Sequence, residues 1–359
     1  MYLKITAIEL FEENIPLKQP FITSKRRIDV IKDYVLKIST DDGLCGYGAC
    51  APTPVITGDT VGSIKCAVED FFKPLLIGET LSEELLPRIQ NVLFHNSTPK
   101  AACDIALYDL LAKQAGVPLF EYLGGKKEDK CIKTDATVSL STVEAMVKET
   151  TDHLNAGFSV LKVKLGGGRN LDIERLKAIQ AVIREDTVLR LDANQGWSVE
   201  DTVYISEAAE QMGLNIELIE QPVHYTDLEG MAEVTRRSPF RILADESVFA
   251  PSDAARLIRM GACDMVNIKL MKCGGIYEGL KIHSIAAEHG IECMLGCMME
   301  GGVSVTAAAH FGAAVGIKCY DLDPPYLVHK MPGEGTTRFE GENIYLGKEG
   351  AGLGYTKVL

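Results

Sequence analysis

Five apolar runs between residues 160 and 269 each end in charged residues: Val-Leu-Lys-Val-Lys (160–164), Leu-Arg-Leu-Asp-Ala-Asn (189–194), Glu-Leu-Ile-Glu-Gln-Pro (217–222), Ile-Leu-Ala-Asp-Glu-Ser (242–247) and Met-Val-Asn-Ile-Lys (265–269). Their key residues, Lys164, Asp192, Glu220, Asp245 and Lys269, are 28, 28, 25 and 24 residues apart. This period fits one strand, one helix and two loops. Charges of both signs should therefore lie at the carboxyl ends of consecutive parallel strands, where α/β proteins place their chemistry.

The same alternation of apolar and amphipathic stretches extends over most of the chain from about Cys131 onward. Runs that are apolar throughout are typical of strands buried on both faces, as in a parallel sheet. Eight such runs predict a closed barrel. They are Ile132–Val138, Val160–Lys164, Val188–Asp192, Ile216–Glu220, Ile242–Asp245, Met265–Lys269, Ile291–Leu295 and Cys319–Asp321.

The first third of the chain has a different pattern. Residues 1 to about 48 alternate like strands, and residues 61–123 have apolar residues at helical spacing, which indicates an α+β unit. The Gly-rich end has a short strand signal at Asn343–Leu346, and we expect it to return to the first unit. We therefore predict an α+β domain over 1–125, a barrel over 126–330 and a C-terminal segment over 331–359.

Composition narrows the class of partner. A net charge of −13 argues against nucleic acid and anionic membranes, because both repel an acidic surface. There is no apolar run of 18 residues, and the N-terminus alternates like a strand instead of resembling a secretory signal. The ten cysteines are scattered without a Cys-x2-Cys pair, as expected in a reducing compartment. A cytoplasmic protein is the expectation, and a homo-oligomer remains open.

The three acids Asp192, Glu220 and Asp245 would meet at the mouth of such a barrel. Three adjacent carboxylates repel one another unless a cation neutralises them. Oxygen ligands from separate strands suit Mg²⁺ or a similar hard ion, and the lack of His or Cys at a matching strand end argues against zinc.

The lysines suggest acid–base chemistry. Lys164 and Lys269 end the second and sixth strands, half a barrel apart, and should approach a ligand from opposite sides. Lys162 lies on the same strand face as Lys164. Next to a metal ion, the lysine pKa values should fall below their usual value, which would make a neutral amine available as a base. A hard cation beside two such bases favours removal of an α-proton from a carboxylate substrate, followed by inversion or elimination.

These motifs, in this order and spacing, resemble those of the muconate-lactonising subgroup of the enolase superfamily. The resemblance covers nearly the whole chain and implies a modified TIM barrel, (β/α)7β, with an N-terminal α+β capping domain that the C-terminal segment completes. It implies that Asp192, Glu220 and Asp245 bind one Mg²⁺ per subunit and that Lys164 and Lys269 are the catalytic bases. It also implies that Lys162 stabilises the enolate oxygen.

A second set of residues resembles the dipeptide epimerases of this subgroup. In Tyr-Asp-Leu-Asp-Pro-Pro, the pair Asp321 and Asp323 is similar to the Asp-x-Asp that holds the ammonium of the substrate's first residue. Cys297 and Met298 lie in a segment, Gly296–Gly302, whose backbone meets the peptide unit in that family. The remaining implied substrate contacts are Thr137, Asn194 and Arg26, and Arg26 resembles the arginine that binds a glutamate side chain in Ala-Glu epimerases.

Several alternatives remain open at this point. Lys25 and Arg27 flank Arg26, and Met298 and Met299 could instead face an apolar second residue. Another reaction of the subgroup is the second hypothesis: N-acylamino acid racemisation, o-succinylbenzoate synthesis or cycloisomerisation. Those substrates lack a free ammonium group, so the Asp-x-Asp pair discriminates against them. The third hypothesis is a non-catalytic binding protein on the same scaffold, which loss of a ligand or base would favour.

Overall fold

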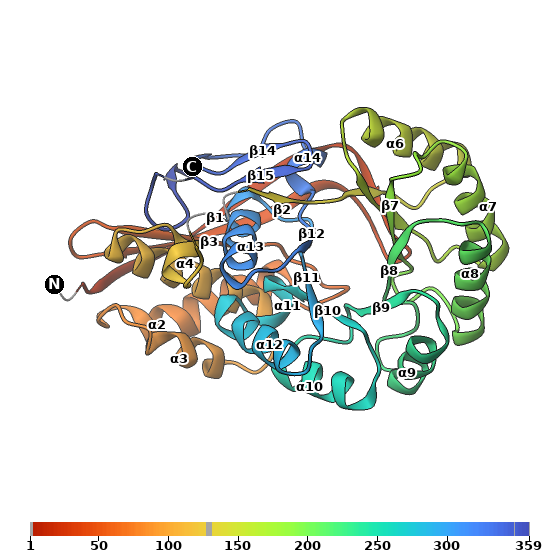
Figure 1. The fold of residues 1–359 in the computed structure, drawn as a ribbon. Coiled ribbons are helices and arrows are strands. Elements are labelled where there is room, and N and C mark those ends of the chain that lie inside the picture. The colour runs from red at the N-terminus through yellow and green to blue at the C-terminus, as the bar shows by residue number, and fades with distance from the viewer. Residues whose placement is uncertain (1–2, 127–130, 348, 359) are drawn as a thin grey trace.

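The computed structural model describes residues 3–126, 131–347 and 349–358, and its centre is an eight-stranded parallel sheet (Figure 1). The strands are hydrogen-bonded in the order of the chain, from β5 to β12. Their bounds are β5 Ala136–Val138, β6 Val160–Lys164, β7 Val188–Asp192, β8 Ile216–Glu220, β9 Arg241–Ala244, β10 Met265–Lys269, β11 Glu292–Gly296 and β12 Cys319–Asp321. The predicted barrel is confirmed.

Seven helical connections link these strands and form the outer layer visible in Figure 1. β12 is followed only by a four-residue helix, α14 (Pro324–Leu327), as the (β/α)7β pattern requires. The connections are α6 Val143–Asn155, α7 Arg169–Gln180, α8 Val199–Gln211, α9 Leu228–Arg237, α10 Pro251–Met260, α11 Leu270–Cys273 together with α12 Ile276–Glu288, and α13 Gly302–Val315.

The local sequence explains where several of the helices begin. It also explains why the strands are buried. Thr142, Ser198 and Asp227 each accept a backbone N–H in the first turn of the following helix, which satisfies a donor that the helix itself leaves free. Strand residues such as Leu189 and Ile219 are fully buried. The pattern of continuous apolar strands therefore reflects a sheet covered on both faces.

The N-terminal unit packs an antiparallel sheet on helices. Its strands are β1 Ile5–Ile22, β2 Arg27–Thr40 and β3 Cys45–Cys50. Its helices are α1 Val61–Cys66, the π-helix η1 Ala67–Phe72, α2 Lys73–Leu76, α3 Leu85–Val92, α4 Ser97–Ala115 and α5 Leu119–Tyr122. β1 and β2 form a long hairpin whose loop, Thr23–Arg26, reaches the barrel mouth.

The C-terminal strands lie against the rest of the molecule and do not form a separate body. β15 (Asn343–Tyr345) pairs with β14 (Arg338–Glu340) and with β4 (Cys131–Lys133), while β13 (Glu334–Gly335) pairs with β16 (Tyr355–Lys357). Gly352 contacts the N-terminal unit, because its carbonyl accepts the N–H of Leu119 at 2.7 Å. The exact domain bounds remain a prediction.

The structure corrects one predicted strand. The run Ile132–Val138 is not one strand: Ile132 belongs to β4, which pairs with β15, and only Ala136–Val138 joins the barrel. The chain changes sheets at Asp135, which turns inward to an ion pair with Arg190 at 2.8 Å. The strand-like pattern expected over residues 1 to about 48 begins with one long strand, because the pairing of β1 with β2 continues to Ile22. None of the helices in the described ranges is long and apolar enough to cross a membrane.

Candidate active site

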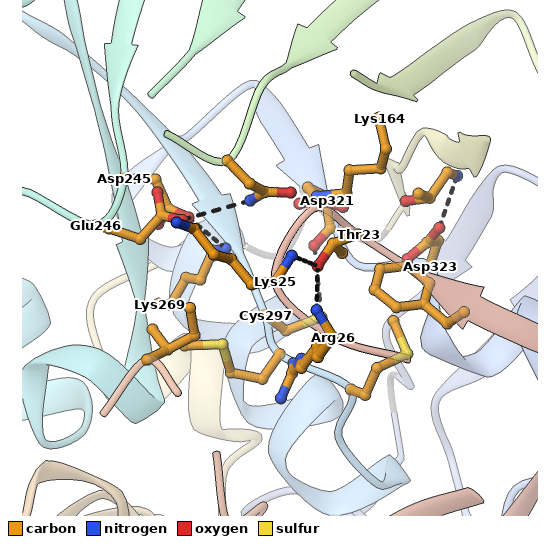
Figure 2. A pocket seen from close by; sticks show the side chains of 16 residues that line it. Thr23, Lys25, Arg26, Lys164, Asp245, Glu246, Lys269, Cys297, Asp321 and Asp323 are labelled. Carbon is orange, nitrogen blue, oxygen red and sulfur yellow. Dashed lines mark hydrogen bonds and ion pairs between the residues drawn. The ribbon is translucent and has the colours of Figure 1, made fainter. Parts of the chain in front are cut away.

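The carboxyl ends of the barrel strands and the β1–β2 loop enclose a pocket that contains most of the predicted site residues (Figure 2). Lys162, Asp192 and Glu220 lie outside its lining and are almost fully buried. The predicted residues that line it are Arg26, Thr137, Lys164, Asn194, Asp245, Lys269, Cys297, Met298, Asp321 and Asp323.

Strand register places the acids side by side. Lys164 pairs with Asp192, and Asp192 pairs with Glu220, so these side chains lie at one level of the sheet. Asp245 directly follows the last residue of β9. All three carboxylates are at most 2% exposed, so each needs a cation or a hydrogen-bond donor.

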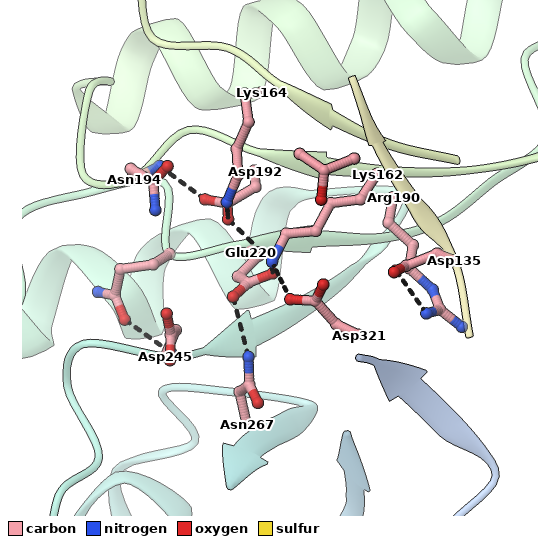
Figure 3. A network of polar contacts seen from close by, with 12 residues as sticks. Asp135, Lys162, Lys164, Arg190, Asp192, Asn194, Glu220, Asp245, Asn267 and Asp321 are labelled. Carbon is pink, nitrogen blue, oxygen red and sulfur yellow. Dashed lines mark hydrogen bonds and ion pairs between the residues drawn. The ribbon is translucent and has the colours of Figure 1, made fainter. Parts of the chain in front are cut away.

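Lys162 supplies much of that compensation (Figure 3). Its ammonium lies 2.6 Å from Glu220 Oε2, 3.1 Å from Asp192 Oδ2 and 2.7 Å from Asp321 Oδ2. Burial alone would lower the pKa of Lys162, but these carboxylates raise it well above its ordinary value. Lys162 is therefore held as a cation at the floor of the site.

The two proposed bases each contact one of the acids. Lys164 Nζ lies 2.6 Å from Asp192 Oδ2, and Lys269 Nζ lies 2.8 Å from Asp245 Oδ2. In Figure 2 they approach the labelled cluster from opposite sides, Lys164 from above and Lys269 from below left. This opposition is the arrangement expected from their strands.

The pKa of Lys269 is set by burial and by its carboxylate neighbours. Burial would lower the pKa of Lys269, but the charge of Asp245 opposes burial and raises that pKa above its usual range. The predicted fall in lysine pKa applies to the site with a metal ion bound beside the carboxylates, and it stays a prediction.

The residues fit a hard cation by their donor chemistry. Among the described residues, no group of three or more His, Cys, Asp or Glu side chains is already arranged to hold a metal ion. The acids are instead drawn to ammonium groups, and Lys162 lies between Asp192 and Glu220 as a cation would. Burial and the Asp192 charge raise the pKa of Glu220 to about 7, so a further cation beside it would favour its charged form. Asp192, Glu220 and Asp245 are all-oxygen donors of the kind Mg²⁺ prefers.

Asp321, the last residue of β12, and Asp323 differ in their surroundings. Asp321 pairs with Lys162, and despite burial that charge lowers its pKa to about 2. Asp323 has no ion pair within the described part of the chain; one oxygen accepts the Thr137 N–H at 2.8 Å. Burial and the neighbouring Asp321 raise the pKa of Asp323 to about 6. Asp323 is therefore the member of the pair that lacks a positive partner.

The three consecutive cations at the end of the β1–β2 loop and the start of β2 also differ. Arg27 is exposed and bonds Asp29 at 2.9 Å. Lys25 is exposed at the pocket rim. Arg26 lines the pocket, and its guanidinium has no ion pair among the residues described. Burial lowers the pKa of Arg26 to about 10, and it remains a cation at neutral pH.

The remaining predicted contacts lie around these groups. The Asn194 N–H donates to Asp192 Oδ1 at 2.8 Å, and its amide group faces Glu246 Oε1 at 3.4 Å. The Cys297 N–H donates to the Asp321 carbonyl at 3.2 Å. The Met298 N–H is taken by Glu300 at 2.6 Å, so it is not free for a ligand.

Sequence reasoning missed several residues that hold the site together. Lys272 is 1% exposed and donates to the carbonyls of Asp245 at 2.6 Å and Asn267 at 3.0 Å, and also to the Asp245 carboxylate. Asn267 donates to Glu220 at 3.0 Å. Arg190 lies in a buried strand, and this unusual position for arginine was a signal that could have identified it.

Comparisons with known proteins agree with this geometry. Residues 5–124 match the family "Mandelate racemase / muconate lactonizing enzyme, N-terminal domain", and residues 145–357 match "Enolase C-terminal domain-like". An L-Ala-D/L-Glu epimerase from Clostridium acetobutylicum is 43% identical over 344 residues, covering 95% of each chain.

Solved structures are similar over the full length. The substrate-liganded complex of the L-Ala-D/L-Glu epimerase from Bacillus subtilis has a TM-score of 0.96 and 39% identity, covering 99% of this chain and 100% of that one. A dipeptide epimerase from Enterococcus faecalis, complexed with Mg and L-Leu-L-Tyr, has a TM-score of 0.92 and 38% identity, covering 98% and 99%.

Proposed function

This chain belongs to the mandelate racemase/muconate lactonizing enzyme family of the enolase superfamily, and from that premise we propose that it is a magnesium-dependent dipeptide epimerase. The observation that carries the proposal is the pair of buried lysines on opposite sides of an acidic cluster, next to an unpaired acid at the end of the eighth strand. The sequence lacks none of the residues that the resemblance implies as bases or ligands, which argues against a non-catalytic binding protein.

Asp192, Glu220 and Asp245 would hold the Mg²⁺. The bound ion supplies positive charge that attracts the substrate carboxylate and stabilises the negative charge that develops as the α-proton leaves. Lys162, fixed as a cation beneath the site, adds to that stabilisation. Lys272 and Asn267 keep two of the carboxylates in place through their own hydrogen bonds.

Lys164 and Lys269 would exchange the α-proton of the second residue. One amine, in its neutral form, takes the proton from one face of the carbon, and the electrons of the C–H bond move into the carboxylate as an enediolate. The other lysine, in its ammonium form, returns a proton to the opposite face, which inverts the carbon. For the mirror-image substrate the roles reverse, so one site serves both directions.

Asp323 would receive the ammonium of the first residue, with the negative charge of Asp321 beside it. A buried acid without a positive partner gains most from a charge-assisted bond of this kind. This feature favours a free dipeptide over the N-acylated, succinylated or lactone substrates of the alternative reactions, which bring no ammonium group. Thr137, Asn194 and the backbone near Cys297 and Met298 would complete the wall around the peptide.

Arg26 favours an acidic second residue, as in L-Ala-D/L-Glu. A guanidinium that lines the pocket without a partner is suited to a carboxylate side chain. A second candidate is an apolar residue, because Phe21, Met298 and Met299 line the same pocket. The relative from Enterococcus faecalis named "Hydrophobic dipeptide epimerase", 39% identical, keeps that alternative in view.

A substrate panel tests the proposal. The enzyme with Mg²⁺ is incubated with Ala-Glu, Ala-Leu and N-acetyl-glutamate, and the stereochemistry of the products is read by chiral chromatography. Inversion at the second residue of a free dipeptide is expected. Turnover of the N-acylated compound in preference to both dipeptides would contradict the assignment.

A further inference from the structure

The first and last strands of the barrel, β5 and β12, meet at a seam that one long backbone hydrogen bond and several side chains bridge. The hydrogen-bonded order of the sheet begins at β12 and ends at β5, and no ladder joins the two within the described residues. The Asp135 N–H reaches the Tyr320 carbonyl at 3.4 Å, and Arg190 Nη1 donates to the same carbonyl at 2.6 Å. Thr134 accepts the Leu322 N–H at 2.7 Å.

Farther along this edge, side chains bond the backbone groups of Thr137 and Ser139. The Thr137 N–H donates to Asp323 Oδ2 at 2.8 Å. His153 Nε2 lies 3.0 Å from the Thr137 carbonyl, and Glu149 Oε2 accepts the Ser139 N–H at 2.8 Å. Buried backbone groups need hydrogen-bond partners, and here side chains provide the bonds that a neighbouring strand would otherwise make.

His153 and Glu149 lie one turn apart on α6, on the face that covers this edge. The Thr137 carbonyl can only accept, so His153 Nε2 carries the proton. Burial lowers the pKa of His153, which keeps the ring neutral. Its Nδ1 is then an acceptor and faces the Tyr326 hydroxyl at 3.4 Å.

These contacts reach Asp323 from two directions. Thr137, held by His153, donates to the Asp323 carboxylate. Tyr326, the other neighbour of His153, donates its N–H to the Asp323 carbonyl at 2.9 Å. A shift of the imidazole would therefore move both the donor to the carboxylate and the backbone that carries it.

We propose that His153 and Glu149 are positioning residues that set the ammonium-binding site of the enzyme by fixing the seam around Asp323. The inference rests on the proposed function, because it takes Asp323 as the ammonium partner. Neither residue lies in the pocket that contains the lysines, so they act through Asp323 and not on proton transfer.

A double-mutant cycle tests this directly. Epimerisation of Ala-Glu is measured for the parent, His153→Leu, Asp323→Asn and the double variant. Loss of the His153 bond is expected to raise KM about five- to tenfold with kcat changed much less, because a buried carbonyl loses its donor and Asp323 shifts. In the Asp323→Asn background the same change should have little further effect on KM. His153→Gln, which can still donate to Thr137, should recover most of the loss.

Controls separate positioning from general stability. Lys148→Ala alters an exposed residue of the same helix and should leave KM unchanged. Glu149→Ala is the second variant, in case His153→Leu does not fold, and it should show the same non-additivity with Asp323→Asn. Additive effects in both cycles would overturn this inference but not the proposed function. A fall in kcat as large as the rise in KM would do the same. A parent enzyme that inverts no free dipeptide would overturn the proposed function and this inference together.

Discussion

At the scale of single residues, the charged side chains of the site differ in how many partners they have and in whether they line the pocket. Lys162 and Lys272 are 1% exposed and bonded on several sides, so their side chains are fixed in place. Lys164 and Lys269 border the pocket, where a substrate can reach them. Arg26 and Asp323 line the pocket as well, and neither forms an ion pair with a described residue.

Metal binding should depend on Asp245. Asp245→Asn removes a charged oxygen and leaves Lys269 and Lys272 facing a neutral amide. Since even supporting residues of metal sites change affinity by about 10- to 100-fold, we expect Mg²⁺ affinity to fall at least about tenfold. Isothermal titration calorimetry measures it, with the exposed Asp186→Asn as the matched control. Equal affinity in the two variants would show that the site is misassigned.

Arg26 should decide the preference for the second residue. Arg26→Ala would leave a glutamate side chain without its partner, whereas a leucine side chain loses no charged contact. We expect kcat/KM for Ala-Glu to fall about tenfold or more, since hydrogen bonds to charged groups contribute roughly 1.5–3 kcal/mol, with a smaller change for Ala-Leu. Arg27→Ala, which removes a cation already paired with Asp29, is the control. Equal losses on both dipeptides, or a parent that prefers Ala-Leu, would exclude the Ala-Glu assignment.

At the scale of elements, the spacing of the apolar runs predicted the repeated strands of the barrel but not the features that occur once. The strand ends at Lys164, Asp192, Glu220 and Lys269 fall where the spacing placed them, because each βα unit solves the same packing problem. The run Ile132–Val138 divides between two sheets at Asp135, whose ion-pair partner Arg190 is 55 residues away, and a local pattern cannot reveal such distant partners. His153 was also missed, because one polar residue on an amphipathic helix looks like any other.

Close packing between β3 and α4 gives an element-scale prediction. A Cβ atom at Gly48 would lie 1.9 Å from the Ala102 carbonyl oxygen, so Gly48→Ala forces the strand and the helix apart. We expect a loss of about 1–3 kcal/mol in unfolding free energy, measured by urea denaturation. Gly62→Ala, where the nearest atom would be 3.7 Å away, should be neutral or slightly stabilising. Similar midpoints for both variants would contradict this packing.

At the scale of the whole molecule, the capping unit and the barrel share buried polar contacts that no single segment encodes. Asp33 of β2 is fully buried and accepts the N–H of Gly301, next to the segment that lines the pocket, at 2.9 Å. The family resemblance predicted that the two units assemble. The contact between Asp33 and Gly301 could not be predicted from the composition or spacing of either unit. A homo-oligomer likewise remains a prediction, because contacts between subunits do not produce a repeating pattern in the sequence of one chain.

Asp33 should make stability depend on pH. Burial raises its pKa from 3.8 to about 6, so the folded state holds the proton more tightly than the unfolded state. The resulting stabilisation is complete below about pH 3.8 and is lost as pH rises through about 6, by on the order of 2–3 kcal/mol. Asp33→Asn can still accept the Gly301 N–H but cannot titrate. The difference in unfolding free energy, parent minus variant, should therefore decrease as the pH is raised from 4 to 7. A difference independent of pH would contradict the raised pKa of Asp33.

The central claim is that two lysines act on opposite faces of one α-carbon, and deuterium exchange tests it most directly. Each enantiomer of the second residue is incubated in deuterated water with Lys164→Ala or Lys269→Ala, and mass and chirality are followed together. We expect both variants to lose epimerisation. Each should still be able to exchange the α-proton of one enantiomer, the opposite one in the two variants, because the remaining lysine can remove and return a proton on its own face. Epimerisation at the parent rate by either variant would contradict two-base catalysis.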